Sequence, residues 1–88
     1  YGGDEFCVIM PESDRITCLR FMNRLKHKIA GSRFPVPQLG KDLSCTVSQG
    51  GAVFPDNGIN SEQLVFAADM ALLHSKEKGR NQYHLFEK

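Results

Sequence analysis

Several features that mark other classes of protein are scarce or missing in this sequence. The 88 residues contain no apolar run near the roughly 20 residues that a transmembrane helix needs. No signal-peptide pattern opens the chain, and the formal net charge is only +1. That balance argues against a nucleic-acid-binding patch or a polybasic membrane anchor. The sequence therefore predicts a cytoplasmic protein with no membrane segment and no nucleic-acid partner.

The three cysteines are too few and too widely spaced for a disulfide framework. Each cysteine sits within an apolar pattern, so we expect buried free thiols in a reducing compartment. They are Cys7, Cys18 and Cys45.

The histidines show no metal-ligand spacing with each other or with the cysteines. We interpret His27, His74 and His84 as surface or partly buried side chains. No Ser-His-Asp arrangement can be argued from the order of the residues either.

The most informative stretch is the opening Tyr1–Phe6, in which two glycines precede two carboxylates. Gly2 and Gly3 suit a tight turn or a close approach of the backbone to a ligand. The apolar run Phe6–Met10 that follows has the length and β-branched content of a buried strand. Acids at the mouth of a strand suit Mg²⁺, and bare glycine backbone leaves room for a phosphate or sugar. Taken alone, however, the pattern also fits an ordinary hairpin connection.

A glycine hairpin needs a strand on its N-terminal side, and only Tyr1 precedes this turn. We therefore expect a fragment of a longer protein. At 88 residues it forms one domain at most.

The first helix is predicted from Ser13 or Asp14 as N-cap to about Ala30, with Gly31-Ser32 as its stop. Apolar residues recur on one face of this helix, at Cys18, Phe21, Met22, Leu25 and Ile29.

The prolines and glycine within 33–42 predict a loop or an irregular edge hairpin. Residues 43–54 are strand-like, and Gly50-Gly51 within them suggests a bulge or a close backbone contact. Pro55–Gly58 is a strong turn signal.

The second helix should begin at Asn60 or Ser61, with Gln63 completing a capping box on Asn60, and end near Lys78-Gly79. Its narrow apolar stripe of mostly small residues predicts close packing on a sheet. A final short strand is expected over 83–86. The order strand-helix-strand-helix-strand predicts an α/β or α+β sandwich with helices on a mostly antiparallel sheet.

Three blocks of the chain resemble one family. Gly2–Phe6 matches, letter for letter, the signature of the GGDEF family of bacterial diguanylate cyclase domains. Ala68–Asn81 resembles the family's closing pattern A-D-x-A-L-Y-x-A-K-x-x-G-R-N, and Cys45–Gly50 resembles its T-V-S-I-G strand. The resemblance covers essentially all of residues 1–88, read as the C-terminal part of one GGDEF domain.

The resemblance implies roles for the signature residues. Asp4 would be a ligand of Mg²⁺ or Mn²⁺ needed for catalysis, and Glu5 would contact the metal or the attacking hydroxyl. Gly2 and Gly3 would lie against the nucleotide. Without the resemblance, the two acids could equally be solvated turn residues.

Three cations also receive roles from the resemblance. Lys76 and Arg80 would contact the triphosphate of GTP, although spacing alone fits a solvated basic helix end that the helix dipole favours. Arg24 falls where the family has the helix arginine of an inhibitory site for the cyclic product. From its pattern alone, Arg24 would be one cation on a solvated face.

This chain departs from the family pattern at Leu73, Ser75 and Gln49. These departures bear on packing more than on chemistry. The family's upstream half, with another metal-binding acid and the guanine-recognising side chains, is not among residues 1–88, so we expect this piece alone to be inactive.

The resemblance implies that the parent protein condenses two GTP molecules into cyclic di-GMP and releases pyrophosphate. Two domains would meet face to face as a homodimer, and a sensory domain would regulate them. Two alternatives stay open: a non-catalytic module that binds GTP or cyclic di-GMP and passes on a signal, and a generic α/β interaction domain with a fortuitous turn.

Overall fold

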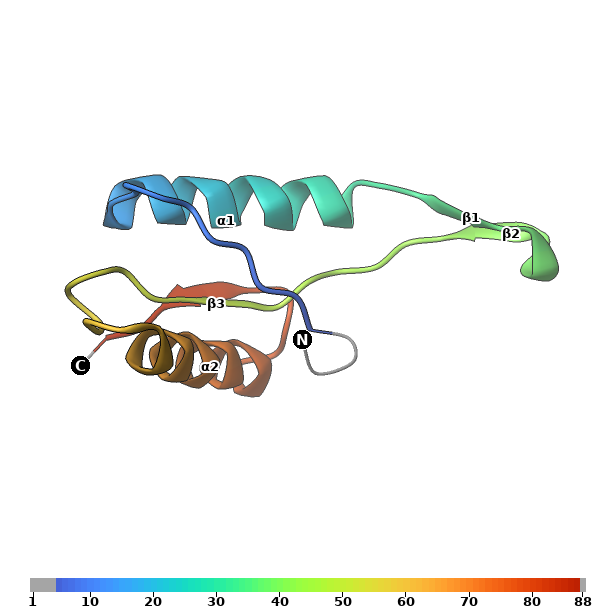
Figure 1. Ribbon diagram of the computed structural model, residues 1–88. Coiled ribbons are helices and arrows are strands. Elements are labelled where there is room, and N and C mark those ends of the chain that lie inside the picture. The colour runs from blue at the N-terminus through green and yellow to red at the C-terminus, as the bar shows by residue number, and fades with distance from the viewer. Residues whose placement is uncertain (1–4, 88) are drawn as a thin grey trace.

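The computed structural model describes residues 5–87 and has an α+β architecture. Two short strands, β3 and β4, lie between the two long helices α1 and α2 (Figure 1). The predicted α+β layout is thereby confirmed. The elements in chain order are α1 (Arg15–Ala30), β1 (Phe34–Val36), the 3₁₀ turn η1 (Pro37–Leu39), β2 (Lys41–Leu43), β3 (Gln49–Gly51), α2 (Ser61–Glu77) and β4 (Tyr83–Leu85).

Helix α1 begins and ends where the sequence predicts. The Thr17 N–H donates to Asp14 Oδ1 at 2.8 Å, so Asp14 is the N-cap, and Gly31 follows the last turn. Hydrogen bonds from Thr17 lower the pKa of the Asp14 carboxyl, because they favour its charged form. Both ends of this helix are determined by a capping residue next to them, which can be recognised in the sequence.

The apolar face of α1 packs on the strand pair to form the core. Met22, Val53 and Leu85 are buried together, and Phe21 and Cys18 pack against them. Burial raises the pKa of the Cys18 thiol, which therefore stays protonated at neutral pH. The predicted apolar face of α1 is confirmed at Cys18, Phe21 and Met22, and the Cys18 thiol is partly rather than fully buried.

Helix α2 approaches β3 very closely at Gly50. A Cβ built on Gly50 would lie 2.1 Å from the Leu72 nitrogen and 2.3 Å from the Ala68 oxygen. Only glycine fits there, so the predicted close backbone contact is confirmed. At the other end of α2, Asn60 is the N-cap and accepts from the Gln63 N–H, while Gln63 Oε1 accepts from Ile59 N–H rather than from Asn60 as the capping box predicts.

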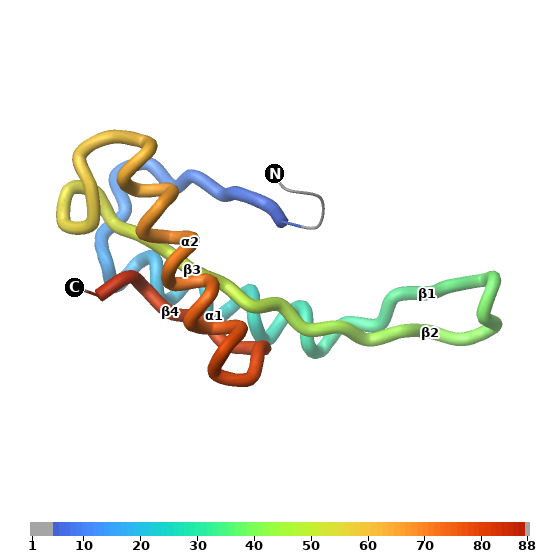
Figure 2. The backbone as a smooth tube through the Cα atoms, turned by 90° about the horizontal axis from the view of Figure 1, so that it is seen from below, coloured from blue at the N-terminus to red at the C-terminus, as the bar shows by residue number. Residues whose placement is uncertain are grey.

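Strands β3 and β4 pair in parallel, with Gln49 opposite Tyr83 and Gly51 opposite Leu85. Parallel pairing requires a crossover connection, which α2 provides. The antiparallel pair of the molecule is the β1–β2 hairpin, with Phe34 opposite Leu43. The prediction of an irregular hairpin over 33–42 is confirmed, and Figure 2 shows this hairpin extending away from the rest of the chain.

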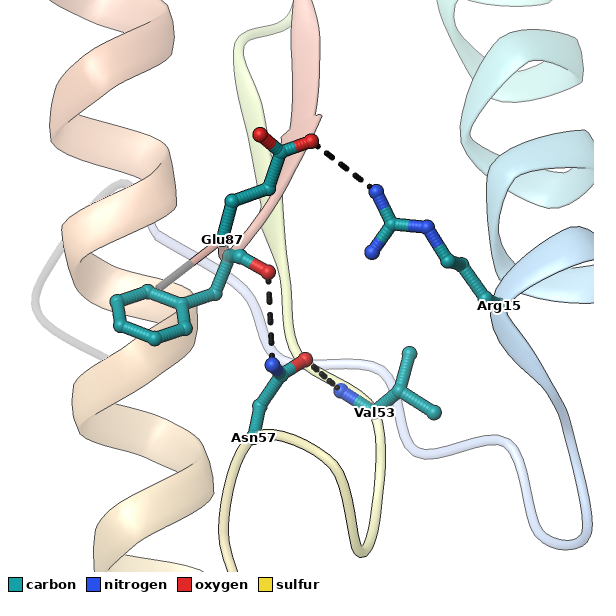
Figure 3. A network of polar contacts seen from close by, with 5 residues as sticks. Arg15, Val53, Asn57 and Glu87 are labelled. Atoms are coloured by element: carbon teal, nitrogen blue, oxygen red, sulfur yellow. Dashed lines mark hydrogen bonds and ion pairs between the residues drawn. The ribbon is translucent and has the colours of Figure 1, made fainter.

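The turn that precedes α2 is fixed by the side chain of Asn57 (Figure 3). Asn57 Oδ1 accepts from the Val53 N–H at 2.8 Å, and its Nδ2 donates to the Phe86 carbonyl at 3.4 Å. Beside it, Arg15 and Glu87 form an ion pair at 3.1 Å that links α1 to the end of the chain. The predicted turn over 55–58 is thus tied to the segment after β4.

Three expectations from the sequence are wrong. Residues 6–10 are not a buried strand: the side chains of Phe6 and Ile9 are 90% and 84% exposed. Within residues 5–87 no strand runs beside this segment, so its backbone groups lack the ladder that would make it a strand. Cys7 and Cys45 are exposed, because both lie in irregular segments. Of the strand-like stretch 43–54, only Leu43, at the end of β2, and Gln49–Gly51, which form β3, pair with another strand.

Candidate functional site

The structure brings two of the predicted site residues together. Lys76, in the last turn of α2, lies with its Nζ 3.5 Å from Oε2 of Glu5 at the start of the described chain. Their side chains keep 35% and 34% of their surface exposed, so water still reaches both groups. Such a pair contributes at most about 1 kcal/mol to stability. Its significance is positional, because it places the end of α2 beside Glu5.

The other signature residues lie outside the described part of the chain. Gly2, Gly3 and Asp4 precede residue 5, so their predicted roles stay predictions. Glu5 is the signature acid whose surroundings are known.

Arg80 is positioned differently from what helical spacing suggests. Helix α2 ends at Glu77, so Lys76 and Arg80 do not share a helical face. Arg80 instead lies in a left-handed turn, with φ of 63°, between Gly79 and Asn81. It is exposed, and its N–H donates to the Ser75 carbonyl at 3.0 Å. The turn keeps Arg80 at the same end of α2 as Lys76.

Arg24 is on a different layer. It is exposed on α1, and Figure 1 shows α1 and α2 on opposite sides of the strand pair. The structure therefore separates Arg24 from the Lys76 end of α2 by an entire layer of the fold. A separate site, such as one for the product, is compatible with that separation.

Comparison with known proteins identifies the family. The family described as "Diguanylate cyclase, GGDEF domain" matches residues 1–82. The chain belongs to the GGDEF family. This GGDEF domain chain is 36% identical over 81 residues to the response regulator PleD of Caulobacter vibrioides. The aligned residues are 92% of this chain and 18% of PleD.

Two further relatives cover nearly the whole chain. The diguanylate cyclase DosC of Escherichia coli is 31% identical over 87 residues, which are 99% of this chain and 18% of DosC. The uncharacterized protein YhcK of Bacillus subtilis is 32% identical, again over 99% of the chain and 24% of its own length. The GGDEF chain thus spans roughly a fifth of the length of these relatives. No helix within residues 5–87 has the length and apolar character to cross a membrane.

Two residues that depart from the family pattern form a buried polar connection that sequence reasoning missed. Ser75 is fully buried, and its Oγ donates to the Gln49 carbonyl at 2.7 Å. Gln49 Nε2 in turn donates to the Met22 carbonyl at 2.8 Å. The chain of bonds links α2, β3 and α1. The signal in the sequence was the pair of departures itself: a serine and a glutamine where the GGDEF pattern has apolar residues.

Two histidines that looked unrelated in sequence are in contact. The rings of His74 and His84 have centroids 4.4 Å apart and meet edge to face, and His84 Nε2 lies 3.1 Å from Gln82 Oε1. Burial, together with the nearby His74, lowers the pKa of His84. The expectation of surface or partly buried histidines is confirmed, because His74 is exposed and His84 is half-buried, while their contact was not predicted.

GGDEF diguanylate cyclases are metal-dependent enzymes, so the donor groups of this site need to be considered. Among residues 5–87 no three His, Cys, Asp or Glu side chains gather in one place. Glu5 is a hard oxygen donor of the kind that Mg²⁺ prefers, and Lys76 contacts one of its two carboxylate oxygens. Glu5 therefore has the donor chemistry that a divalent ion takes, while the predicted second ligand, Asp4, lies outside the described residues.

Proposed function

We propose that the full-length protein is a diguanylate cyclase that condenses two GTP molecules into cyclic di-GMP. Membership of the GGDEF family supports the reaction class. The observation that supports the proposal most is the contact between Lys76 and Glu5, because the two side chains to which we assign triphosphate and metal binding lie 3.5 Å apart.

Different residues of the chain would bind different parts of the nucleotide. Lys76 Nζ, an ammonium group at the end of α2, would hold triphosphate oxygens together with the exposed Arg80, which lies three residues beyond the end of the same helix. Charge-assisted contacts of this kind orient the phosphoryl group that transfers and stabilise its charge. Gly2 and Gly3 would let the backbone approach the nucleotide.

In the reaction, the 3′-oxygen of one GTP forms a bond to the α-phosphorus of the other, and the bond from that phosphorus to the leaving pyrophosphate breaks. The proton of the 3′-hydroxyl would pass to solvent water as the bond forms. Asp4 and Glu5 would hold the divalent ion, Mg²⁺ or Mn²⁺, which would neutralise phosphate charge and align the attack. Repeating the step with the roles exchanged closes the ring, which calls for two domains facing each other as a homodimer.

Two parts of the proposal concern regulation and completeness. Arg24 would belong to an inhibitory site for cyclic di-GMP, and a sensory domain elsewhere in the protein would control the output. The resemblance assigns a further metal-binding acid and the guanine-recognising groups to an upstream segment. We therefore expect residues 1–88 alone to show no turnover of GTP.

The test is cyclic di-GMP formation by the full-length protein with GTP and Mg²⁺, followed by chromatography. Lys76→Ala should lower kcat/KM about 100-fold, because a donor to the transferring phosphate is lost. Asp4→Ala should reduce product to background, as should chelation of the metal. Lys28→Ala, at an exposed lysine of α1, is the matched control and should behave as wild type.

Two outcomes would count against the proposal. Wild-type protein that binds GTP without forming product would favour a non-catalytic signalling module, especially if Asp4→Ala leaves the biological output unchanged. Wild-type protein that binds no guanine nucleotide would favour an interaction domain.

A further inference from the structure

The turn that carries Arg80 has an unusual backbone. Gly79, Arg80 and Asn81 have φ values of 116°, 63° and 52°, so three consecutive residues lie in the left-handed region. Glycine adopts this region freely and asparagine tolerates it, but the Cβ of Arg80 makes it unfavourable. Such a conformation persists only where neighbouring groups hold it.

The neighbours that hold this turn come from α2 and from the start of β3. The Arg80 N–H donates to the Ser75 carbonyl at 3.0 Å, and the Gln49 N–H donates to the Gln82 carbonyl at 2.9 Å. Between these two backbone bonds, the Asn81 N–H donates to Ser48 Oγ at 3.2 Å. Ser48 is thus the side chain from another element that holds the middle of the turn.

Ser48 is itself firmly placed. It is half-buried, and it immediately precedes β3, whose Gln49 is in register with Tyr83 of β4. Gln49 is anchored further through the Met22 carbonyl and through Ser75. The acceptor oxygen of Ser48 therefore belongs to the rigid layer of the fold, while Arg80 lies at its exposed margin.

We propose that Ser48 is a positioning residue that fixes the left-handed turn Gly79–Asn81 and thereby directs Arg80 toward the triphosphate. Ser48 acts through Arg80 and need not touch the nucleotide. The inference rests on the proposed function in one respect, the role of Arg80 in binding GTP. Without the Ser48 oxygen, the Asn81 N–H loses its partner and the turn relaxes toward ordinary backbone conformations.

The experiment uses the full-length protein and compares Ser48→Ala with Ser48→Thr. Ser48→Ala should raise KM for GTP about three- to tenfold, as expected for one lost hydrogen bond, with a smaller change in kcat. Ser48→Thr keeps the hydroxyl and should restore KM. Ser32→Ala removes another serine hydroxyl, which donates to the Lys28 carbonyl at the end of α1, and should leave KM unchanged.

A double-mutant cycle tests whether Ser48 works through Arg80. In an Arg80→Ala background, Ser48→Ala should raise KM no further. Additive effects, or failure of Ser48→Thr to restore KM, would overturn the inference.

Amide hydrogen exchange separates this inference from the proposed function, because it needs no nucleotide. The amides of Arg80 and Asn81 should exchange faster in Ser48→Ala than in wild type, while those of α1 stay unchanged. Unchanged exchange at the turn would show that Ser48 does not hold it and would overturn the inference. Faster exchange in a protein that binds no GTP would uphold the role of Ser48 in the turn and overturn both the role of Arg80 and the proposed function.

Discussion

Apolar character and burial go together differently in two regions of the domain, the packed layer of α2, β3 and β4 and the N-terminal segment 6–10. The layer buries small side chains: Ala67, Ala71 and Ser75 are the buried residues of α2. The segment holds larger and more apolar side chains, yet Val8 and Ile9 are 62% and 84% exposed. Apolar character alone therefore does not decide what is buried in this domain.

Burial depends on whether a segment has a strand to pair with and on how closely a neighbouring element approaches it. Gly50 lets the backbone of α2 come so near to β3 that small residues fill the interface completely. Segment 6–10 has no neighbouring strand among residues 5–87, so its backbone joins no strand ladder, and of its side chains only Met10 is half-buried. The same comparison predicts that substitutions in the layer cost far more than substitutions in the segment.

The largest effect is expected for Gly50→Val. Its Cβ would meet backbone atoms of Leu72 and Ala68 within 2.3 Å, and backbone cannot move aside as a flexible side chain can. We expect the free energy of unfolding, measured by denaturant titration, to fall by about 3 kcal/mol or more.

The control is Gly40→Ala in the β1–β2 hairpin. Gly40 has φ of 65° but open space around it, so only backbone strain opposes a Cβ, and the loss should be about 1 kcal/mol. Equal losses for the two substitutions would show that the close approach of α2 to β3 is not a main source of stability.

A smaller effect is expected from pH, and it too belongs to the packed layer. His84 in β4 has a pKa lowered from 6.5, first by burial and then by His74, with Lys78 acting in the same direction and Glu87 against it. The folded state therefore binds fewer protons than the unfolded chain near that pH. The contribution of His84 to the free energy of unfolding should be fully present above about pH 6.5. It should decline as the pH falls through the lowered pKa of His84.

Denaturant titrations between pH 8 and pH 5 test this, and NMR titration of the imidazole signals identifies the group. His84→Gln should flatten the decline, and His74→Gln should lessen it by removing the second cause. If His84→Gln follows the same pH profile as wild type, another group is responsible.

The parts of the fold that the sequence predicts are those set by residues close in the chain. Asp14 and Asn60 cap their helices through a backbone N–H three residues away, and such bonds can be recognised from spacing. Gly50 likewise indicated a close backbone contact, although the sequence did not identify α2 as the helix that makes it. Local chemistry was sufficient for these features.

The parts that were not predictable depend on distant partners. The Asn81 N–H donates to Ser48 Oγ, 33 positions earlier, and the contact of Lys76 with Glu5 joins residues 71 positions apart. No helical or strand period encodes such bonds. For the candidate site, the family resemblance nominated Glu5, Lys76 and Arg80, and their roles stay predictions. The left-handed turn that separates Arg80 from the helical face of Lys76 emerged only from the fold.

The smallest effect is expected for Ile9→Ser in the 88-residue chain, which tests whether segment 6–10 is exposed in solution. Ile9 is 84% exposed, so replacing it removes little buried surface, and the free energy of unfolding should change by less than about 0.5 kcal/mol. Val53→Ala, at a core residue only 7% exposed, should cost about 2 kcal/mol under the same conditions. A loss for Ile9→Ser as large as that for Val53→Ala would mean that segment 6–10 packs against the domain in solution. The sequence prediction of a buried strand would then be right, and the contrast between the two regions would disappear.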